Sequence, residues 1–154
     1  MSSKNRAGFT LIELLVVIGI IAILAAIVLV AINPGRQFAN ARDTQRHSHL
    51  YSITNAIYQY VAEHNGNLPD IDGDPLTDTF PIEATCIGTD PGCFDLANAG
   101  DGVDTIVPTY IPEIPRDPSS ETPGNTGYFI SQDTNGRVIA SASGELTDII
   151  SVRR

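Results

Sequence analysis

A long, uninterrupted apolar stretch near the N-terminus is the feature that most restricts how this chain can fold. From Leu14 to Ile32 there are 19 consecutive residues without a charge, almost all of them Leu, Val, Ile or Ala. At about 1.5 Å per residue, a helix of this length matches the hydrocarbon core of a bilayer, about 30 Å thick. Lys4 and Arg6 precede the stretch, and basic residues beside a membrane segment tend to stay cytoplasmic. The sequence therefore predicts a single-pass protein of the cytoplasmic membrane with its N-terminus inside and residues 36–154 outside.

One carboxylate, Glu13, lies at the mouth of this stretch. An ionised side chain deep in a bilayer costs at least about 2.5–3.5 kcal/mol, so Glu13 is a candidate functional residue. A secretory signal peptide also has basic residues before an apolar run, but its apolar region is usually about 7–15 residues, and Leu29-Val30-Ala31 is a poor cleavage site. A plain membrane anchor, with Glu13 in the interface, is the second alternative.

The residues around Glu13 carry a family resemblance. Gly-Phe-Thr-Leu-Ile-Glu-Leu-Leu-Val-Val-Ile at 8–18 resembles the signature of type IV pilins and type II secretion pseudopilins. The resemblance implies that residues 1–8 are a leader, that prepilin peptidase cuts between Gly8 and Phe9, and that Phe9 becomes N-methylated. It also implies that Glu13 pairs with the terminal amine of a neighbouring subunit's Phe9 during filament assembly. Unpaired buried charges are costly, so such a pair can specify register.

The next stretch predicts a second helical segment. Asn33-Pro34 is typical of a helix N-cap followed by proline at the first helical position, and proline also breaks a helix that precedes it. Both a bent continuous helix and two abutting helices fit. An apolar stripe on one helical face indicates that residues 36–65 form an amphipathic helix covered on one side: Leu50, Ile53, Ile57, Tyr60, Val61 and His64. Asn65-Gly66-Asn67-Leu68-Pro69 ends it, and resembles the helix exit of major pseudopilins.

Composition limits what the exported part, residues 66–154, can do. The chain has 18 acidic and 9 basic side chains, which argues against general nucleic-acid binding. Two cysteines, Cys86 and Cys93, are expected to form a disulfide, because they lie on an exported segment and have neither CxxC spacing nor a nearby histidine. Pro112–Pro118 resembles the x-Pro-x-Asp-Pro segment of major pseudopilins, and also fits a proline-stiffened surface linker.

Three aspartates invite a calcium interpretation. Asp70, Asp72 and Asp74 alternate around Gly73, which suits a cation that prefers oxygen ligands. The twelve-residue loop and its distal glutamate are missing, and calcium-binding pseudopilins use a site nearer the C-terminus. A solvated turn is therefore the preferred interpretation, calcium remains a minor hypothesis, and no other cofactor is expected.

The C-terminal part predicts a small antiparallel sheet. Tyr128–Ser131 and Arg137–Ser141 flank Asp133-Thr134-Asn135-Gly136, and Asn-Gly between apolar runs indicates a hairpin in which both residues tolerate positive φ. Thr147–Val152 is a third candidate strand. The expected fold is α+β and pilin-like: a long N-terminal helix, membrane-spanning in residues 9–35 and amphipathic in 36–65, packed on a C-terminal antiparallel sheet in an acidic head.

No catalytic motif is evident. His47 and His49 point to different helical faces, and no nucleophile motif or phosphate loop is present. The predicted function is therefore structural: a homo-oligomeric filament subunit of a pilus or a secretion pseudopilus, which depends on prepilin peptidase and an assembly machinery. The alternative from another class is a membrane-anchored binding or adhesion module that never polymerises.

Overall fold

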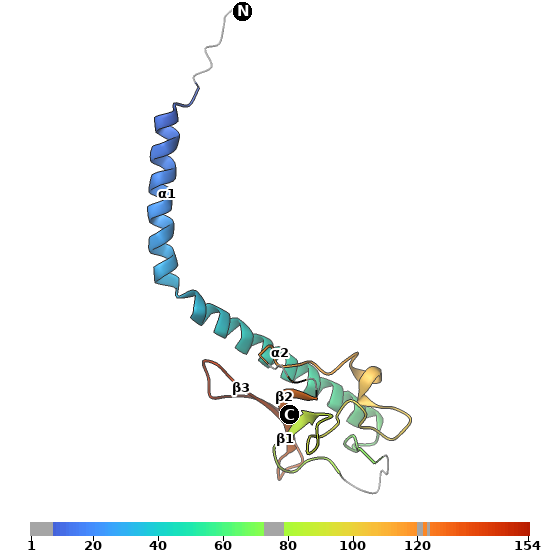
Figure 1. The fold of residues 1–154 in the computed structure, drawn as a ribbon. Helices are drawn as coiled ribbons and strands as arrows, with labels where there is room; N and C mark the ends of the chain where they lie inside the picture. Colours follow the sequence, from blue (N-terminus) through green and yellow to red (C-terminus); the bar gives the residue numbers. More distant parts are fainter. Residues whose placement is uncertain (1–7, 73–78, 120–121, 123) are drawn as a thin grey trace, which may run out of the picture. The chain divides into compact units, whose positions relative to one another are not determined.

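The computed structural model describes residues 8–72, 79–119, 122 and 124–154. The chain divides into two units, Met1–Phe38 and Ala39–Arg154, and each is described by itself. Two helices come first, α1 (Leu11–Ile32) and α2 (Pro34–Glu63), followed by the strands β1 (Thr85–Gly88), β2 (Asn125–Gln132), β3 (Val138–Ser143) and β4 (Ile149–Arg153) (Figure 1). The predicted α+β class is confirmed.

Two abutting helices, and not one bent helix, occupy residues 11–63. Asn33 ends α1 with φ of 48°, a left-handed conformation that asparagine tolerates better than most residues. Pro34 then begins α2, where its missing N–H would have no helical partner in any case. The Asn33 side-chain oxygen accepts a hydrogen bond from the Arg36 backbone N–H at 3.4 Å. Asn33 therefore closes one helix and caps the next.

The end of α2 agrees with its sequence signal. Asn65 and Gly66 both have positive φ, 56° and 94°. The Gly66 N–H donates to the Val61 carbonyl at 2.9 Å, which satisfies a backbone acceptor of the last helical turn. The chain can then leave the helix axis at Asn67 and Leu68.

The four strands form one antiparallel sheet in the order β1-β2-β3-β4. The C-terminal prediction is confirmed with shifted bounds, since the third predicted strand, Thr147–Val152, is β4 at Ile149–Arg153. The sequence interpretation missed β1, a strand of four residues, and also a short helical segment, η1 (Ile106–Tyr110). Both lie within residues 66–125, where no periodic pattern is long enough to signal them.

The β2–β3 hairpin is present, but its turn differs from the predicted one. Gly136 has φ of 79°, whereas Asn135 is not among the residues with positive φ. The Gly136 N–H donates to the Asp133 carbonyl at 2.9 Å, and the Asp133 N–H donates to the Arg137 carbonyl at 2.8 Å. This is a three-residue loop with glycine at the left-handed position. The Asp133 carboxylate accepts hydrogen bonds from the Asn135 and Arg137 N–H groups and so stabilises this three-residue loop.

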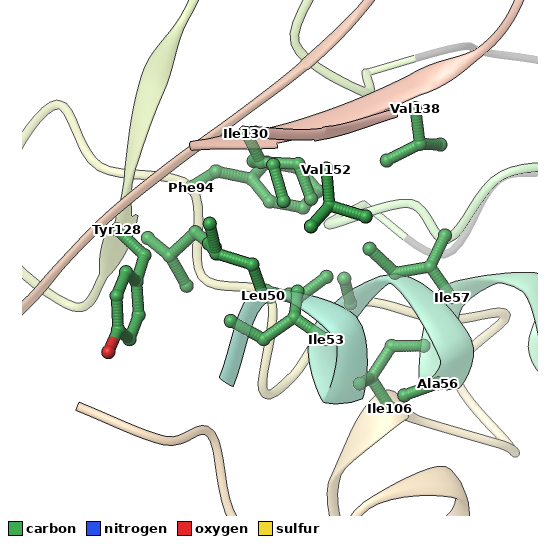
Figure 2. Packing of buried hydrophobic residues seen from close by; sticks show 14 of the residues in the cluster. Leu50, Ile53, Ala56, Ile57, Phe94, Ile106, Tyr128, Ile130, Val138 and Val152 are labelled. Carbon is green, nitrogen blue, oxygen red and sulfur yellow. The ribbon is translucent and has the colours of Figure 1, made fainter. Parts of the chain in front are cut away.

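The core of residues 39–154 lies between one face of α2 and the inner face of the sheet. Leu50, Ile53 and Ile57 are 0 % exposed. Figure 2 shows these helix side chains facing Ile130 of β2 and Val152 of β4. Most members of the predicted helical stripe are therefore buried as expected, with Val61 and His64 at its partly buried margin. Burial alternates along the strands, so every second side chain reaches the core.

Removal of one core side chain tests this packing. Ile57→Ala deletes three buried carbon atoms and leaves a cavity, so the free energy of unfolding of the head is expected to fall by about 2–5 kcal/mol. Urea unfolding of the full chain in detergent, followed by near-UV circular dichroism, measures the change. Gln59→Ala, an exposed position on the same helix, is the matched control and is expected to change stability by less than about 0.5 kcal/mol. Equal losses of unfolding free energy in the two variants would contradict the packing of Ile57 in the core.

Candidate processing and assembly site

Glu13 and Thr10 form a reciprocal cap at the start of α1. The Thr10 hydroxyl oxygen accepts from the Glu13 N–H at 3.3 Å, and a Glu13 carboxylate oxygen accepts from the Thr10 N–H at 3.1 Å. The Thr10 hydroxyl also donates to that carboxylate oxygen at 3.0 Å. Threonine followed three residues later by glutamate is the sequence pattern of a capping box, so Thr10 could have been identified from the sequence alone. The cap points the Glu13 carboxylate back toward the peptide that joins Phe9 to Thr10.

The neighbouring predicted processing residues are accessible. Gly8 precedes the helix in a segment without regular secondary structure and is exposed, and Phe9 is 83 % exposed. Because α1 begins at Leu11, the bond between Gly8 and Phe9 lies outside regular helical structure. A peptidase must bind its target bond in an unfolded, accessible segment, so this placement suits the predicted cleavage.

Every residue of α1 is exposed within its own unit. None of the 22 residues from Leu11 to Ile32 is buried, although nearly all are apolar. In the described part of the chain this is the helix that is long and apolar enough to cross a membrane. A helix that is hydrophobic on all sides needs apolar surroundings on all sides. Membrane anchoring supplies them.

The predicted disulfide is present: Cys86, on β1, is bonded to Cys93, seven residues later. Its short loop brings Ile87 beside Phe94, and both of these side chains are buried in the core. By the chain-entropy estimate, closure of so short a loop contributes about 2–3 kcal/mol. The disulfide therefore holds the irregular part of the head against the sheet.

The aspartates proposed for calcium are not gathered into a metal site. Within residues 8–72, 79–119, 122 and 124–154, no group of three or more His, Cys, Asp or Glu side chains could hold a metal ion. Asp74 lies outside the described residues. The preferred interpretation, a solvated turn, is wrong for Asp70, which is only 6 % exposed. Its carboxylate accepts a hydrogen bond from the Asp72 N–H at 3.2 Å, and its carbonyl accepts one from the Gly100 N–H at 2.6 Å. These contacts hold Asp70 against the loop around Gly100.

The three histidines make separate contacts. His49 shares a 2.7 Å hydrogen bond with the Tyr128 hydroxyl, and His64 stacks on Tyr60 with ring centroids 3.9 Å apart. His47 lies against Tyr51. The histidines thus act in local packing and hydrogen bonding.

An ionic cluster around the buried Arg46 and Asp43 was not anticipated from the sequence. It consists of Arg42, Asp43, Arg46, Asp117 and Glu145, which we call the Arg46 cluster. Arg46 is 2 % exposed and forms a two-bond pair with Asp117, at 2.6 and 3.0 Å. Its guanidinium also donates to Asp43 at 2.8 Å and to Glu145 at 3.1 Å. The cluster therefore ties α2 to the Pro112–Pro118 segment and to the β3–β4 loop.

Backbone amides complete the cluster. The Asp43 carboxylate accepts from the N–H groups of Glu145 and Leu146, each at 2.9 Å. Asp117 lies in the segment that was predicted to be either a family landmark or a surface linker, and its pairing with Arg46 fixes that segment in place. In the sequence, Arg46 is one basic residue among other polar residues of α2. Nothing in that local pattern identifies Asp117, 71 residues away, as its partner.

Contacts within the Arg46 cluster lower the pKa values of its three carboxyl groups. The hydrogen bond from Arg42 lowers the pKa of Glu145 to about 2, against the effect of burial. At Asp117, burial favours the neutral form, yet hydrogen bonds from Arg46 and the Ser119 N–H hold the pKa below its usual value. At Asp43, burial is likewise outweighed by the Glu145 and Leu146 amides, so its pKa is also lowered. All three carboxylates are therefore charged at neutral pH.

A family model matches the N-terminal part of the chain. Residues 3–29 match the model of the prokaryotic N-terminal methylation motif, the signature of type IV pilins and pseudopilins. A search of curated proteins gave no match. A search of solved structures gave none either. The chain thus carries a pilin-type precursor motif on a pilin-like α+β arrangement, and the motif points to a structural subunit.

The Arg46 cluster makes a prediction about stability and pH. Arg46→Met leaves Asp43 and Asp117 without their cation, so the free energy of unfolding at pH 7 is expected to fall by about 3–5 kcal/mol. Carboxylates with a lowered pKa stabilise the folded state above their unfolded pKa, and this contribution is lost as the pH falls through the folded value. The deficit of the variant is therefore expected to narrow between about pH 5 and pH 2.

Urea unfolding across that pH range measures both effects. Arg116→Met, at an exposed arginine with no ion pair in the described residues, is the control and is expected to behave as the unmodified chain. A deficit that stays constant with pH would show that lost packing of the long side chain, and not lost charge pairing, causes the effect.

Proposed function

We propose that this protein is a structural subunit of a filament, either a type IV pilus-like fibre or a type II secretion pseudopilus. Prepilin peptidase removes residues 1–8 by cutting between Gly8 and Phe9, and Phe9 becomes N-methylated. The methylation motif at residues 3–29 is the observation that carries the proposal. The exposed, non-helical segment at Gly8 and Phe9 supports it.

The proposed mechanism begins with storage of subunits in the cytoplasmic membrane. Residues 9–35 form the membrane-spanning and assembly segment, residues 36–65 the amphipathic helix, and residues 66–154 the extracytoplasmic head. In the bilayer, the apolar surface of α1 is covered by lipid. On assembly, the α1 helices of sister subunits cover one another. On assembly, the apolar surfaces of sister helices replace the lipid tails around α1, so the hydrophobic effect favours neither environment strongly. Side-chain packing and polar contacts therefore decide whether a subunit moves from the membrane into the filament.

Glu13 supplies the polar contact in this mechanism. Cleavage converts the Phe9 amide into a terminal amine, two residues before the start of α1. The capping box holds the Glu13 carboxylate near that end of the helix, with one oxygen 3.1 Å from the Thr10 nitrogen. In apolar surroundings the amine of a neighbouring subunit and this carboxylate neutralise each other, and an incorrect register leaves both charges unpaired.

Intact-mass spectrometry of the protein recovered from a membrane or sheared-filament fraction tests the processing step. The expected mass is that of a chain starting at Phe9 with one added methyl group. A chain that begins after Ala31 would instead identify a secreted soluble head. An uncut Met1 chain, from cells that contain the peptidase, would leave only a plain membrane anchor.

A pair of Glu13 variants separates charge from helix capping. Glutamine at this position of a capping box can still accept the Thr10 N–H, so Glu13→Gln keeps the cap and removes the charge. The variant is expected to be processed normally yet to yield less than about a tenth of the filaments, a loss equivalent to about 1.4 kcal/mol or more of assembly free energy. Shearing followed by quantitative immunoblotting measures the yield.

Thr10→Ala is the matched variant for the cap. It removes the hydroxyl and keeps the Glu13 charge, and it is expected to reduce the filament yield much less than Glu13→Gln does. Normal filaments from Glu13→Gln would refute the charge-pairing mechanism. Absence of filaments from the unmodified chain, together with normal surface exposure of the head, would favour a tethered binding module instead.

A further inference from the structure

The outer edge of strand β4 is a surface that the proposed assembly mechanism does not use. In the sheet order β1-β2-β3-β4, the two edge strands are β1 and β4. The edge of β1 is covered, because Phe94 donates its N–H to the Cys86 carbonyl at 2.7 Å and accepts the Gly88 N–H at 3.1 Å. Strand β4 pairs with β3 on one side, and its other edge has no hydrogen bond to any residue that the structure describes.

The ladder between β3 and β4 shows which backbone groups lie at this edge. The Arg154 N–H donates to the Val138 carbonyl at 3.1 Å, and the Gly144 N–H donates to the Asp148 carbonyl at 3.5 Å. Hydrogen bonding alternates along an antiparallel ladder, so every second residue between Asp148 and Arg154 bonds to β3. The N–H and C=O groups that point away from β3 therefore belong to three residues: Ile149, Ser151 and Arg153.

Strand β4 lacks the devices with which many sheets protect an edge. Its pairing with β3 runs without a bulge, and Ile149–Arg153 contains neither proline nor lysine. Prolines, lysines and bulges are common on edge strands because they prevent pairing with another chain. A regular edge with open N–H and C=O groups is a template for a further strand.

The charges around β4 make this strand complementary to itself. Asp148 precedes the strand, and Arg153 and Arg154 end it. When two copies of β4 lie antiparallel with Ser151 opposite Ser151, Asp148 of each copy lies opposite Arg154 of the other. Ile149 then lies opposite Arg153, whose aliphatic stem can cover it. In this register every outward N–H meets an outward C=O, whereas a shift by two residues leaves some unpaired and separates the charges.

Contacts with α2 hold Arg154 in position for such a pair. Its Nη1 donates to the Asn55 side-chain oxygen at 2.6 Å, and its carbonyl accepts a hydrogen bond from the Tyr58 hydroxyl. A guanidinium has five donors, so this arginine can bind a carboxylate as well. The end of β4 is thus fixed by α2, and its charge can still meet an acidic residue of a second copy.

The helix face that borders the start of β4 carries no formal charge. The exposed residues of α2 between 44 and 59 include no Asp, Glu, Lys or Arg, although the chain has 18 acidic side chains. A groove of about 520 Å³ joins this face to β4, and His47, Tyr51 and Ile150 contribute to its lining. A second acidic head that approaches this side therefore meets no exposed carboxylate of α2 between residues 44 and 59.

We propose that two copies of this chain pair through their β4 strands, antiparallel and with Ser151 at the two-fold axis, so that their sheets become continuous. Both copies use the same surface, so the contact is isologous and closes on itself. A contact that closes on itself does not extend a fibre. The pair is therefore a contact between heads that is separate from the proposed assembly through α1 and does not depend on it.

Single-cysteine variants of the full chain in membranes test the pairing. Directly opposite residues that exchange hydrogen bonds have Cα atoms about 5.5 Å apart, within reach of a disulfide. Ser151→Cys places its two copies at this distance, whereas the two copies of Arg153→Cys are about 14 Å apart. Under mild oxidation, Ser151→Cys is expected to give at least about five times as much linked dimer as Arg153→Cys, its control on the same strand and face.

A mixture of two variants tests the register. Ile149→Cys and Arg153→Cys, each with a different tag, are expected to link to each other and not to themselves. The described residues contain no free cysteine, so each link identifies the introduced thiols. Equal linkage in Ser151→Cys and Arg153→Cys, or no linkage in Ser151→Cys, would overturn the proposal.

Ser151→Pro tests the edge hydrogen bonds without disturbing the sheet. The Ser151 N–H points away from β3, so proline removes an edge donor and leaves the ladder with β3 intact. In analytical ultracentrifugation of the full chain in detergent, this variant is expected to dimerise at least about tenfold more weakly than the unmodified chain. Its melting temperature in dilute solution is expected to be unchanged.

A charge reversal with its rescue separates lost pairing from a damaged fold. Asp148→Lys places a like charge opposite Arg154 of the second copy and is expected to weaken dimerisation at least about threefold, less so at high salt. Addition of Arg154→Glu to this variant reverses both charges and is expected to restore the dimer, which a damaged fold would not allow. Dimerisation that is unchanged in both Ser151→Pro and Asp148→Lys would show that another surface joins the copies.

Discussion

The contact between one face of α2 and the inner face of the sheet is the interaction on which the head depends. Leu50, Ile53 and Ile57 are fully buried there, and each buried side chain of this size contributes about 1.5–3 kcal/mol. The sheet has four short strands, so it could not bury its apolar face without the helix. The disulfide and the Arg46 cluster then fix the loops around this contact, Cys86–Cys93 on the β1 side and Arg46–Asp117 on the side of the Pro112–Pro118 segment.

The first helix, α1, belongs to a different compact unit from the head. None of its residues is buried, although nearly all are apolar, whereas most apolar residues in the second half of α2 lie on one buried face. A helix surface of this kind is stable only in apolar surroundings, which a lipid bilayer supplies. In the proposed function, the same surface packs against other copies of α1 after assembly. The reciprocal cap between Thr10 and Glu13 places one carboxylate at the end of this surface, and in the proposed mechanism this carboxylate specifies the register between neighbouring helices.

Charge is used in two different ways in the acidic head. In the Arg46 cluster, every carboxylate has a guanidinium partner or backbone donors, and the lowered pKa values show that the charged forms are preferred in the folded state. At Asp70, by contrast, one carboxylate oxygen accepts the Asp72 N–H, and the other has no hydrogen-bond partner among the residues that the structure describes. Paired buried charges thus hold distant segments of the head together.

The sequence by itself determined the elements that depend on local rules. The apolar run gave the bounds of α1 to within a few residues, the stripe from Leu50 to Tyr60 predicted which face of α2 is buried, and the two cysteines predicted their own pairing. Gly136 marked the hairpin, although the capping of two amides by Asp133 selected a three-residue turn over the predicted form. Thr10 belongs to the same group, because a capping box can be read from spacing alone.

Only the tertiary structure decided the contacts between residues far apart in the chain. Arg46 and Asp117 are 71 residues apart, and nothing in the local pattern around either one specifies the other. The strand β1 has four residues and is stabilised by its pairing with β2, so its own sequence contains too little information to identify it. Asp70 looked like part of a solvated turn because its burial depends on Gly100, a residue of a distant loop. Local propensity and periodicity follow from neighbouring residues, whereas burial and charge pairing follow from which segments the fold brings together.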